Sequence, residues 1–291
     1  MKPLYSAEGA ARLETIVRAG VLCVFDFDGT LAPIVAQPDD AHLPTPVRLR
    51  LQALQQHAPV AILTGRALSD IDARLDFSAD FMIGNHGLEG LPDSAERRSA
   101  HQQVCATWRT AVQAALGDSA RFESTLLMED KQVSLSLHYR HARNQAAARQ
   151  QLLALFDTLT PAPRVIAGKC VFNLLPQGSG DKGTAFEQLM TISGASSAIY
   201  VGDDVTDEDV FQLERDDLLS VRIGQTTGSA APFFLRRHTD ILRLLDDLTA
   251  RLKAFSTALA SRSAPEATPV SPTLTETGMH AQGHKNPHRK D

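Results

Sequence analysis

Two aspartates, Asp26 and Asp28, follow a hydrophobic run in the segment VLCVFDFDGT at residues 21–30. In a β-strand, side chains two positions apart lie on the same face, so these carboxylates would project together where the strand leaves its sheet. Two carboxylates at such short range require a nearby cation, or one of them must hold a proton. The segment therefore predicts a site for a metal ion or for acid–base chemistry at the end of a buried strand.

Two further hydrophobic runs end in polar clusters. VAIL at 60–63 leads into Thr64, Gly65 and Arg66, and AIYV at 198–201 leads into the segment GDDVTDED at 202–209. The five carboxylates of this last segment are costly to hold together unless positive charge lies among them. In open α/β sheets ligands bind beyond the carboxyl ends of the strands, so we expect these clusters to converge there.

Lys182 supplies a positive charge at the start of a predicted helix, in the segment GSGDKGTAFEQL at 178–189. A cation near the positive end of a helix dipole is unfavourable, which indicates a negatively charged partner. A phosphate group held between a Mg²⁺ ion, the helix N-terminus and the Lys182 ammonium would provide one. The sequence therefore predicts a magnesium-dependent phosphate site.

Continuous aliphatic runs at 21–25, 60–63, 198–201 and 218–223 predict strands that are covered on both faces. Apolar residues recur at helical spacing between them, at 46–57 and 182–190. Alternating strands and helices of this kind are typical of a parallel sheet. We therefore expect an α/β protein with a Rossmann-like parallel sheet as its core.

The middle of the chain follows another pattern. The segment at 131–140 alternates apolar and polar residues, which predicts a strand with one polar face, and helix-like stretches flank it at 101–116 and 143–159. We interpret this region as an inserted smaller α/β cap domain at 91–168, between core segments at 1–90 and 169–261. The remainder, 262–291, is rich in Pro, Ser and Thr and is expected to be a disordered tail.

Composition excludes several classes of partner. The net charge is −5 and no long basic run is present, so we expect neither nucleic acid nor a membrane surface as a partner. The three cysteines are widely spaced, which argues against a disulfide framework, and no apolar run is long enough to span a membrane. These features predict a cytoplasmic protein.

The motifs DFDGTL at 26–31, TGR at 64–66, DKG at 181–183 and GDDVTDED at 202–209, in this order, resemble those of the haloacid dehalogenase-like phosphohydrolases. Together with IGNHGLE at 83–89 and HYR at 138–140, the pattern is similar to the trehalose-6-phosphate phosphatase family. The resemblance spans residues 20 to 245. It implies hydrolysis of trehalose 6-phosphate to trehalose and phosphate, and functional coupling to a trehalose-phosphate synthase.

The resemblance also implies roles for single residues. Asp26 would attack phosphorus and form an aspartyl-phosphate, while Asp28 would protonate the departing sugar oxygen and later activate water. Thr64 and Lys182 would hold the phosphoryl oxygens. The implied ligands of Mg²⁺ are Asp26, the backbone carbonyl of Asp28, and Asp203, with Asp204 or Asp207 acting directly or through water.

A cap that closes over the substrate would exclude water and select the sugar. The resemblance, which places sugar contacts on the cap and its hinge, suggests a set of residues from both domains for binding the substrate. These are Gly65, Arg66, Asn85, His86, Glu89, Glu129, Lys131, His138, Arg140, Lys169 and Asn173.

One segment departs from the family pattern. Many members have a Glu in a GKxxxE motif and then a basic residue, whereas GKCVFNLLPQG here has Asn173 and Leu175. An amide cannot provide a charged acceptor for a sugar hydroxyl. Phosphates of sucrose, glucosylglycerol or mannosylglycerate therefore stay open as substrates. A phosphomutase and a non-catalytic sugar-phosphate sensor are further alternatives, although the intact acidic motifs and Lys182 argue against the sensor.

Overall fold

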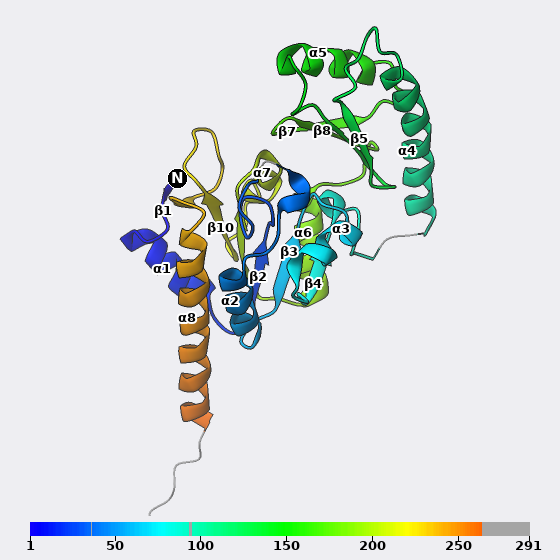
Figure 1. Ribbon diagram of the computed structural model, residues 1–291. Helices are drawn as coiled ribbons and strands as arrows, with labels where there is room; N and C mark the ends of the chain where they lie inside the picture. The colour runs from blue at the N-terminus through cyan, green and yellow to red at the C-terminus, as the bar shows by residue number, and fades with distance from the viewer. Residues whose placement is uncertain (36, 93–94, 264–291) are drawn as a thin grey trace, which may run out of the picture.

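The large sheet forms the core of the protein. The computed structural model describes residues 1–35, 37–92 and 95–263, and within them seven parallel strands lie in the order β1-β11-β10-β9-β2-β3-β4 (Figure 1). The strands are β1 (Lys2–Pro3), β2 (Val21–Phe25), β3 (Val60–Leu63), β4 (Phe81–Ile83), β9 (Ser197–Gly202), β10 (Leu218–Ile223) and β11 (Phe233–Leu235). The predicted α/β class with a parallel sheet is therefore confirmed.

Alternate residues of the central strands pack on opposite faces of this sheet. On β2, Val21, Cys23 and Phe25 join one hydrophobic cluster, whereas Leu22 and Val24 join another. The first cluster is covered by α1 (Ala7–Ile16), α2 (Thr45–Gln55), α3 (Leu68–Leu75) and α8 (Asp240–Ser263). The second is covered by α6 (Lys182–Ser193) and α7 (Glu208–Phe211). Burial on both faces explains why these strands read as continuous apolar runs.

The strand order reverses between β2 and β9. From β2 the chain continues through β3 and β4 on one side, whereas β9 leads to β10 and β11 on the other. Phe25 pairs with Val201, and the backbone N–H of Asp26 donates to Val201 O at 2.9 Å. Asp26 and the residues after Gly202 therefore leave the sheet side by side at the switch point, where open α/β sheets bind ligands.

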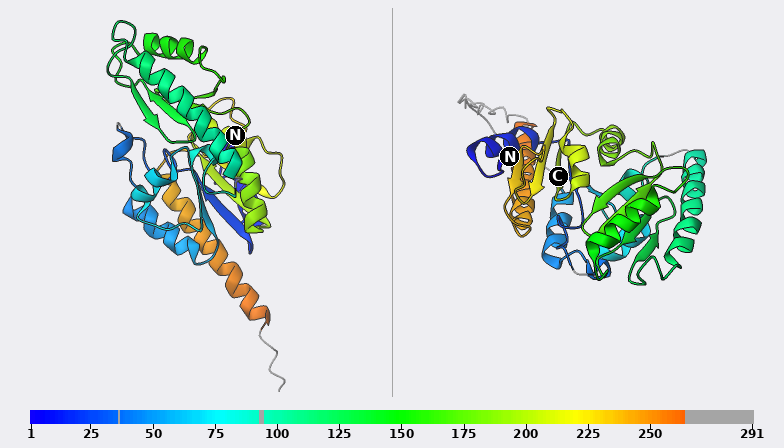
Figure 2. Two further views of the ribbon diagram at one scale, coloured as in Figure 1. Left: turned by 90° about the vertical axis from the view of Figure 1, so that its right-hand side faces the viewer. Right: turned by 90° about the horizontal axis from the view of Figure 1, so that it is seen from above.

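A second, antiparallel sheet forms the cap. Its strands are β5 (Leu127–Asp130), β6 (Leu135–His138), β7 (Arg164–Gly168) and β8 (Val171–Leu175), in the order β5-β6-β8-β7. The helices α4 (Ala95–Leu116) and α5 (Gln145–Phe156) cover its outer face through a cluster that includes Trp108, Leu152 and Phe172. Figures 1 and 2 show this unit beyond one end of the large sheet, so its uncovered face is available to the site.

The strands predicted at 21–25, 60–63, 198–201 and 218–223 are confirmed as β2, β3, β9 and β10. The small sheet includes β8, which begins at Val171, although the sequence division resumes the core at 169. The strand predicted at 131–140 is wrong in length: β6 covers Leu135–His138, because a turn precedes it in which Gln132 has a φ of 68°.

Three further expectations concern the C-terminal tail, the cysteines and membrane-spanning helices. Residues 262 and 263 of the expected tail lie in α8, and the rest of that tail lies outside the described residues. The three cysteines are unpaired, as the sequence predicted. Among the helices that the structure describes, none has the length and apolarity needed to cross a lipid bilayer.

We expect Leu152→Ala in the cap and Leu244→Ala in α8 each to lower the free energy of unfolding by about 2–5 kcal/mol, because both side chains are fully buried. Urea denaturation measures the change. The control Leu49→Ala, at a leucine that is 55% exposed, should change it by less than about 0.5 kcal/mol. A negligible loss at Leu152 would contradict the packing of α5 on the small sheet.

Candidate active site

A buried ammonium group joins the ends of two segments. Lys182 is the first residue of α6 and is 1% exposed. Its Nζ atom donates to Asp26 Oδ1 and to Asp207 Oδ1, at 2.7 Å in each case. Burial disfavours the charged form of Lys182, but Asp207 and Asp26 outweigh that effect and raise its pKa above the usual value. The side chain therefore stays charged and holds the end of β2 against the loop after β9.

Asp207 is fully buried in the short 3-10 helix η3 (Val205–Asp207). Its Oδ1 atom accepts hydrogen bonds from Lys182 and from the Tyr200 hydroxyl, the latter at 2.6 Å. Its Oδ2 atom accepts from the backbone N–H groups of Asp203 and Asp204, both at 2.8 Å. Four donors thus surround two oxygens. Asp207 is a positioning residue for Lys182 and for the acidic loop, and little of either oxygen remains for a metal ion.

Carboxylate oxygens of Asp26, Asp203 and Asp207 lie within 4.8 Å of one another. Asp203 Oδ2 accepts from Lys169 at 3.2 Å, whereas Oδ1 is buried and has no hydrogen-bond partner among the described residues. A Cβ atom at Gly29 would collide with this carboxylate, so glycine permits the close approach. Burial raises the pKa of Asp203 to about 6, although Lys169 opposes the shift. Hard divalent cations suit such oxygens, so Asp26 and Asp203 fit Mg²⁺.

The carboxylate of Asp26 belongs to the same buried cluster. Burial raises its pKa, Lys182 opposes that shift, and Asp207 and Asp203 add to it. A divalent cation bound at the cluster would act in the same direction as Lys182 and favour the ionised form. The residues of this edge therefore favour a positively charged ligand beside the Lys182 ammonium.

Asp28 lies at the mouth of the site, with its side chain 43% exposed. Arg66 binds both of its oxygens: Nε lies 2.6 Å from Oδ2, and Nη2 lies 2.7 Å from Oδ1. Such a two-pronged pair fixes the plane of a carboxylate. Arg66 also donates to Asp70 Oδ2 in α3 at 2.7 Å. The cluster after β3 therefore orients the second aspartate of the opening motif.

Thr64 and His86 lie side by side at the end of β3. Thr64 is 1% exposed, and His86 is 7% exposed with a φ of 57° inside the 3-10 helix η2 (Asn85–Gly87). Both ring nitrogens of His86 are buried and have no hydrogen-bond partner among the described residues. Burial, followed by the charges of Lys182, Lys131 and Arg164, lowers the pKa of His86 well below 6.5. A neutral, unpaired imidazole therefore lines the cavity.

A cavity of about 640 Å³ separates this edge from the small sheet. Cations of the cap cross it to reach the core: Lys131 Nζ donates to Gly65 O at 3.1 Å, and Arg140 Nη1 donates to Val35 O at 3.0 Å. The Lys169 ammonium crosses as well, to the acidic cluster. The cap therefore brings positive charge to a site whose floor is acidic, an arrangement that suits an anionic ligand.

The structure brings most of the expected site residues to this one cavity. Its lining includes Asp26, Asp28, Thr64, Gly65, Arg66, His86, Glu129, Lys131, His138, Arg140, Lys169, Asn173, Lys182, Asp203 and Asp204. On the cap, Glu129 Oε2 lies 3.0 Å from His138 Nε2.

Asn85 and Glu89 lie behind the cavity and do not line it. Asn85 is fully buried, donates to Lys131 O at 3.3 Å and accepts from Ser134 Oγ at 2.9 Å. Glu89 Oε2 accepts from the backbone N–H of Leu68 at 2.7 Å, at the start of α3. Asn85 thus joins the cap to the core, and Glu89 caps a helix; neither side chain reaches the cavity.

Sequence reasoning missed three supporting residues. Tyr200 binds Asp207, Ser136 lies beside Asn173 in the cavity, and Arg222 holds the acidic loop. The Arg222 guanidinium donates to the carbonyl oxygens of Asp203 and Asp204 and to the carboxylate of Glu208. A lone arginine inside the apolar run LLSVRI at 218–223 was the signal that could have revealed it.

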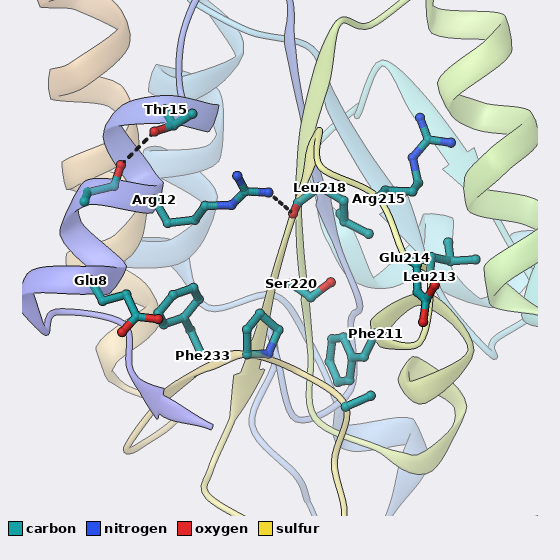
Figure 3. A pocket seen from close by; sticks show the side chains of 13 residues that line it. Glu8, Arg12, Thr15, Phe211, Leu213, Glu214, Arg215, Leu218, Ser220 and Phe233 are labelled. Atoms are coloured by element: carbon teal, nitrogen blue, oxygen red, sulfur yellow. Dashed lines mark hydrogen bonds between the residues drawn. The ribbon is translucent and has the colours of Figure 1, made fainter.

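A second hollow of about 610 Å³ lies between α1 and β10 (Figure 3). None of the residues that line it belongs to the set predicted from the sequence. Its most prominent cation, Arg12, donates to Leu218 O at 3.1 Å and to Asp216 O, which fastens α1 to β10. The chemistry-bearing cavity is therefore the one at the switch point.

We expect the buried His86 to lower the free energy of unfolding as the pH falls through 6.5, because His86 binds a proton in the unfolded chain but not in the folded protein. In His86→Gln, the loss of unfolding free energy from pH 7.5 to 5.5 should be smaller than in the wild type by about 1 kcal/mol. Chemical denaturation at both pH values measures this, with exposed His57→Gln as the control. Equal pH dependence in wild type and His86→Gln would contradict a neutral buried ring.

Comparisons with known proteins agree with this geometry. A family model described as trehalose-phosphatase matches residues 24–237. A trehalose-phosphate phosphatase of Mycobacterium avium is 32% identical over 228 residues, which cover 74% of this chain and 54% of the relative. A Mycobacterium tuberculosis protein described as an uncharacterized glycosyl hydrolase is 32% identical over 200 residues, covering 65% of this chain and 15% of the relative. The chain thus spans less than two thirds of the length of these curated relatives.

A solved structure of similar fold is the C-terminal domain of Candida albicans trehalose-6-phosphate phosphatase, with a TM-score of 0.66 at 20% identity. The match covers 86% of this chain and 98% of that domain. The family model includes every residue of the acidic cluster, the Lys182 ammonium and the cap face that lines the cavity. The chain belongs to the trehalose-phosphatase family.

Proposed function

We propose that this protein is a Mg²⁺-dependent phosphatase that hydrolyses trehalose 6-phosphate to trehalose and phosphate through an aspartyl-phosphate on Asp26. The observation that carries the proposal is the cluster at the switch point. There, Asp26 lies 2.7 Å from the buried Lys182 ammonium, beside Asp203, with Asp28 two residues further on at the cavity mouth. Family membership supports the same substrate.

In the first half of the reaction, an oxygen of Asp26 attacks phosphorus while the bond from phosphorus to the sugar oxygen breaks. Lys182 holds Asp26 in place and neutralises a phosphoryl oxygen, and Thr64 donates a hydrogen bond to another. Asp28 gives its proton to the departing sugar oxygen. The first products are free trehalose and a phosphorylated Asp26.

In the second half, Asp28 takes a proton from a water molecule, whose oxygen attacks phosphorus as the bond to Asp26 breaks. Arg66, which binds both oxygens of Asp28, fixes the plane of the carboxylate and favours its ionised form, the form that takes the proton from water. Mg²⁺, when bound by Asp26, Asp203 and the Asp28 backbone carbonyl, supplies positive charge that stabilises the phosphoryl oxygens. The donors around Asp207 favour Asp204 as the residue that acts through water.

The cap supplies the sugar contacts and excludes water. Glu129, Lys131 and His138 lie on or next to its uncovered face and line the cavity. Functional coupling to a trehalose-phosphate synthase follows from the substrate. A cytoplasmic location also belongs to this proposal, because a charged sugar phosphate does not cross a membrane unaided.

A purified sample with Mg²⁺ should release phosphate from trehalose 6-phosphate, and chelation by EDTA should abolish the release. Asp26→Asn should lower kcat by about 10³-fold or more, because the amide cannot form the phosphorylated enzyme. A phosphate-release assay on the wild type and on Asp26→Asn measures this. The control Asp157→Asn, at an exposed cap residue, should keep full activity. If a folded, Mg²⁺-loaded sample released phosphate from none of a set of disaccharide phosphates, the proposed phosphatase activity would be excluded.

We expect Asp28→Asn to slow both halves of the reaction, each by about 10²–10⁴-fold, because one carboxyl group serves as acid and then as base. Rapid-quench measurements separate the burst of trehalose from steady turnover. When Asp28→Asn acts on an aryl phosphate, whose leaving group needs no proton, the rate of the burst should fall far less than the rate of steady turnover. A variant with normal burst and normal turnover would remove Asp28 from both roles.

A further inference from the structure

The uncovered face of the small sheet carries a row of side chains that point into the cavity. Glu129, Ser136, Asn173 and Ile166 are direct neighbours across the four strands, in the order β5, β6, β8, β7. All four line the cavity. The alternate residues of the same strands pack under α4 and α5 on the outer face. Register therefore fixes Ser136 and Asn173 as a pair that faces the cavity.

The two members of this pair are hydrogen-bonded to each other. Ser136, which is 1% exposed, donates from Oγ to Asn173 Oδ1 at 2.6 Å. A carboxamide has one acceptor oxygen and an NH₂ group with two donors. Ser136 occupies one of the two lone pairs of that oxygen, so the NH₂ group, which is the only donor of the side chain, is the part of Asn173 with the most capacity left for a ligand. A glutamate at this place, as in the family motif, would present the opposite polarity.

We propose that the NH₂ group of Asn173 donates to an acceptor oxygen of the sugar leaving group, and that Ser136 is the positioning residue that sets this polarity. The inference deepens the proposed function and rests on it. The substrate class is a phosphorylated glycoside that brings a hydroxyl or carboxylate oxygen to this point. Neutral Asn173 and the nearby cations Lys131 and Arg140 are compatible with either a hydroxyl oxygen or a carboxylate oxygen.

The decisive variant is Asn173→Asp. Aspartate has nearly the shape of asparagine and still accepts from Ser136, but it replaces the donor by a charged acceptor. We expect the KM for trehalose 6-phosphate to rise by about tenfold or more with kcat nearly unchanged, because a sugar oxygen that acts as an acceptor here, with its own hydrogen donated elsewhere, would face a second acceptor. KM and kcat for a small aryl phosphate, which lacks the sugar, should stay within about twofold of the wild type.

The matched control is Asn144→Asp. Asn144 caps α5 on the far side of the cap by accepting from the backbone N–H of Ala147 at 3.0 Å, and aspartate caps a helix equally well. This control should leave both substrates unaffected.

Ser136→Ala tests the positioning role. It removes the hydroxyl that holds the amide, so the KM for the sugar phosphate should rise about threefold to tenfold while aryl phosphate hydrolysis is unchanged. Ser136→Thr keeps the hydroxyl and should restore the wild-type KM. A residue with a merely structural role would change both substrates together, and threonine would not rescue it selectively.

The results can overturn each part. An unchanged or lower KM in Asn173→Asp excludes the donor, and an unchanged KM in Ser136→Ala excludes the positioning role. Equal losses on sugar and aryl phosphates would assign the effects to distortion of the cap and exclude both.

A panel of phosphorylated glycosides, some neutral and some bearing a carboxylate, separates this inference from the proposed function. If the protein hydrolyses another phosphorylated glycoside of the panel and not trehalose 6-phosphate, the proposed function is wrong. The KM values of the Asn173 variants for that glycoside then decide the inference. A far larger loss for a carboxylate-bearing member in Asn173→Asp would identify the carboxylate as the acceptor. Hydrolysis of no member would overturn both.

Discussion

A buried ammonium held between two carboxylates is the interaction on which the rest of this structure depends. Removing Lys182 from water costs several kcal/mol, which its contacts to Asp26 and Asp207 must offset. Those contacts tie β2, the start of α6 and the loop after β9 to one point. The sheet topology permits this, because β2 and β9 are neighbours where the strand order reverses. Architecture and chemistry therefore share one constraint.

The acidic loop after β9 shows how the protein distributes charge. Lys182 faces Asp207, Lys169 faces Asp203, and Arg222 faces Glu208. The protein therefore neutralises much of this loop with its own cations. Because one ammonium, that of Lys182, is shared between Asp207 and Asp26, negative charge is in excess there, beside the buried oxygen of Asp203 that has no hydrogen-bond partner among the described residues. This separation makes one point of the edge suited to a divalent cation, which the mere number of acidic residues does not do.

Much of the core could be predicted from the sequence, because strands buried on both faces must read as apolar runs. The segments at 21–25 and 198–201 therefore gave both the strands and the place where Asp26 and Asp203 leave them. Strands of two or three residues, such as β1 and β4, are too short to carry a pattern. The role of Glu89 was beyond reach for another reason: a carboxylate that caps a helix at Leu68 and one that binds a sugar look the same in sequence.

The phosphoryl chemistry and the sugar selection that we propose lie on different structural units. The proposed nucleophile Asp26, the proposed acid–base residue Asp28 and Lys182 lie at the edge of the large sheet, whereas Ser136 and Asn173 lie on strands of the cap. A change of polarity on the cap leaves the distances among Asp26, Lys182 and Asp203 untouched. The cap contacts to the core that are described above, such as that of Arg140 with Val35 O, come from residues other than Ser136 and Asn173, so under the proposed function the sugar preference can vary while the reaction stays the same.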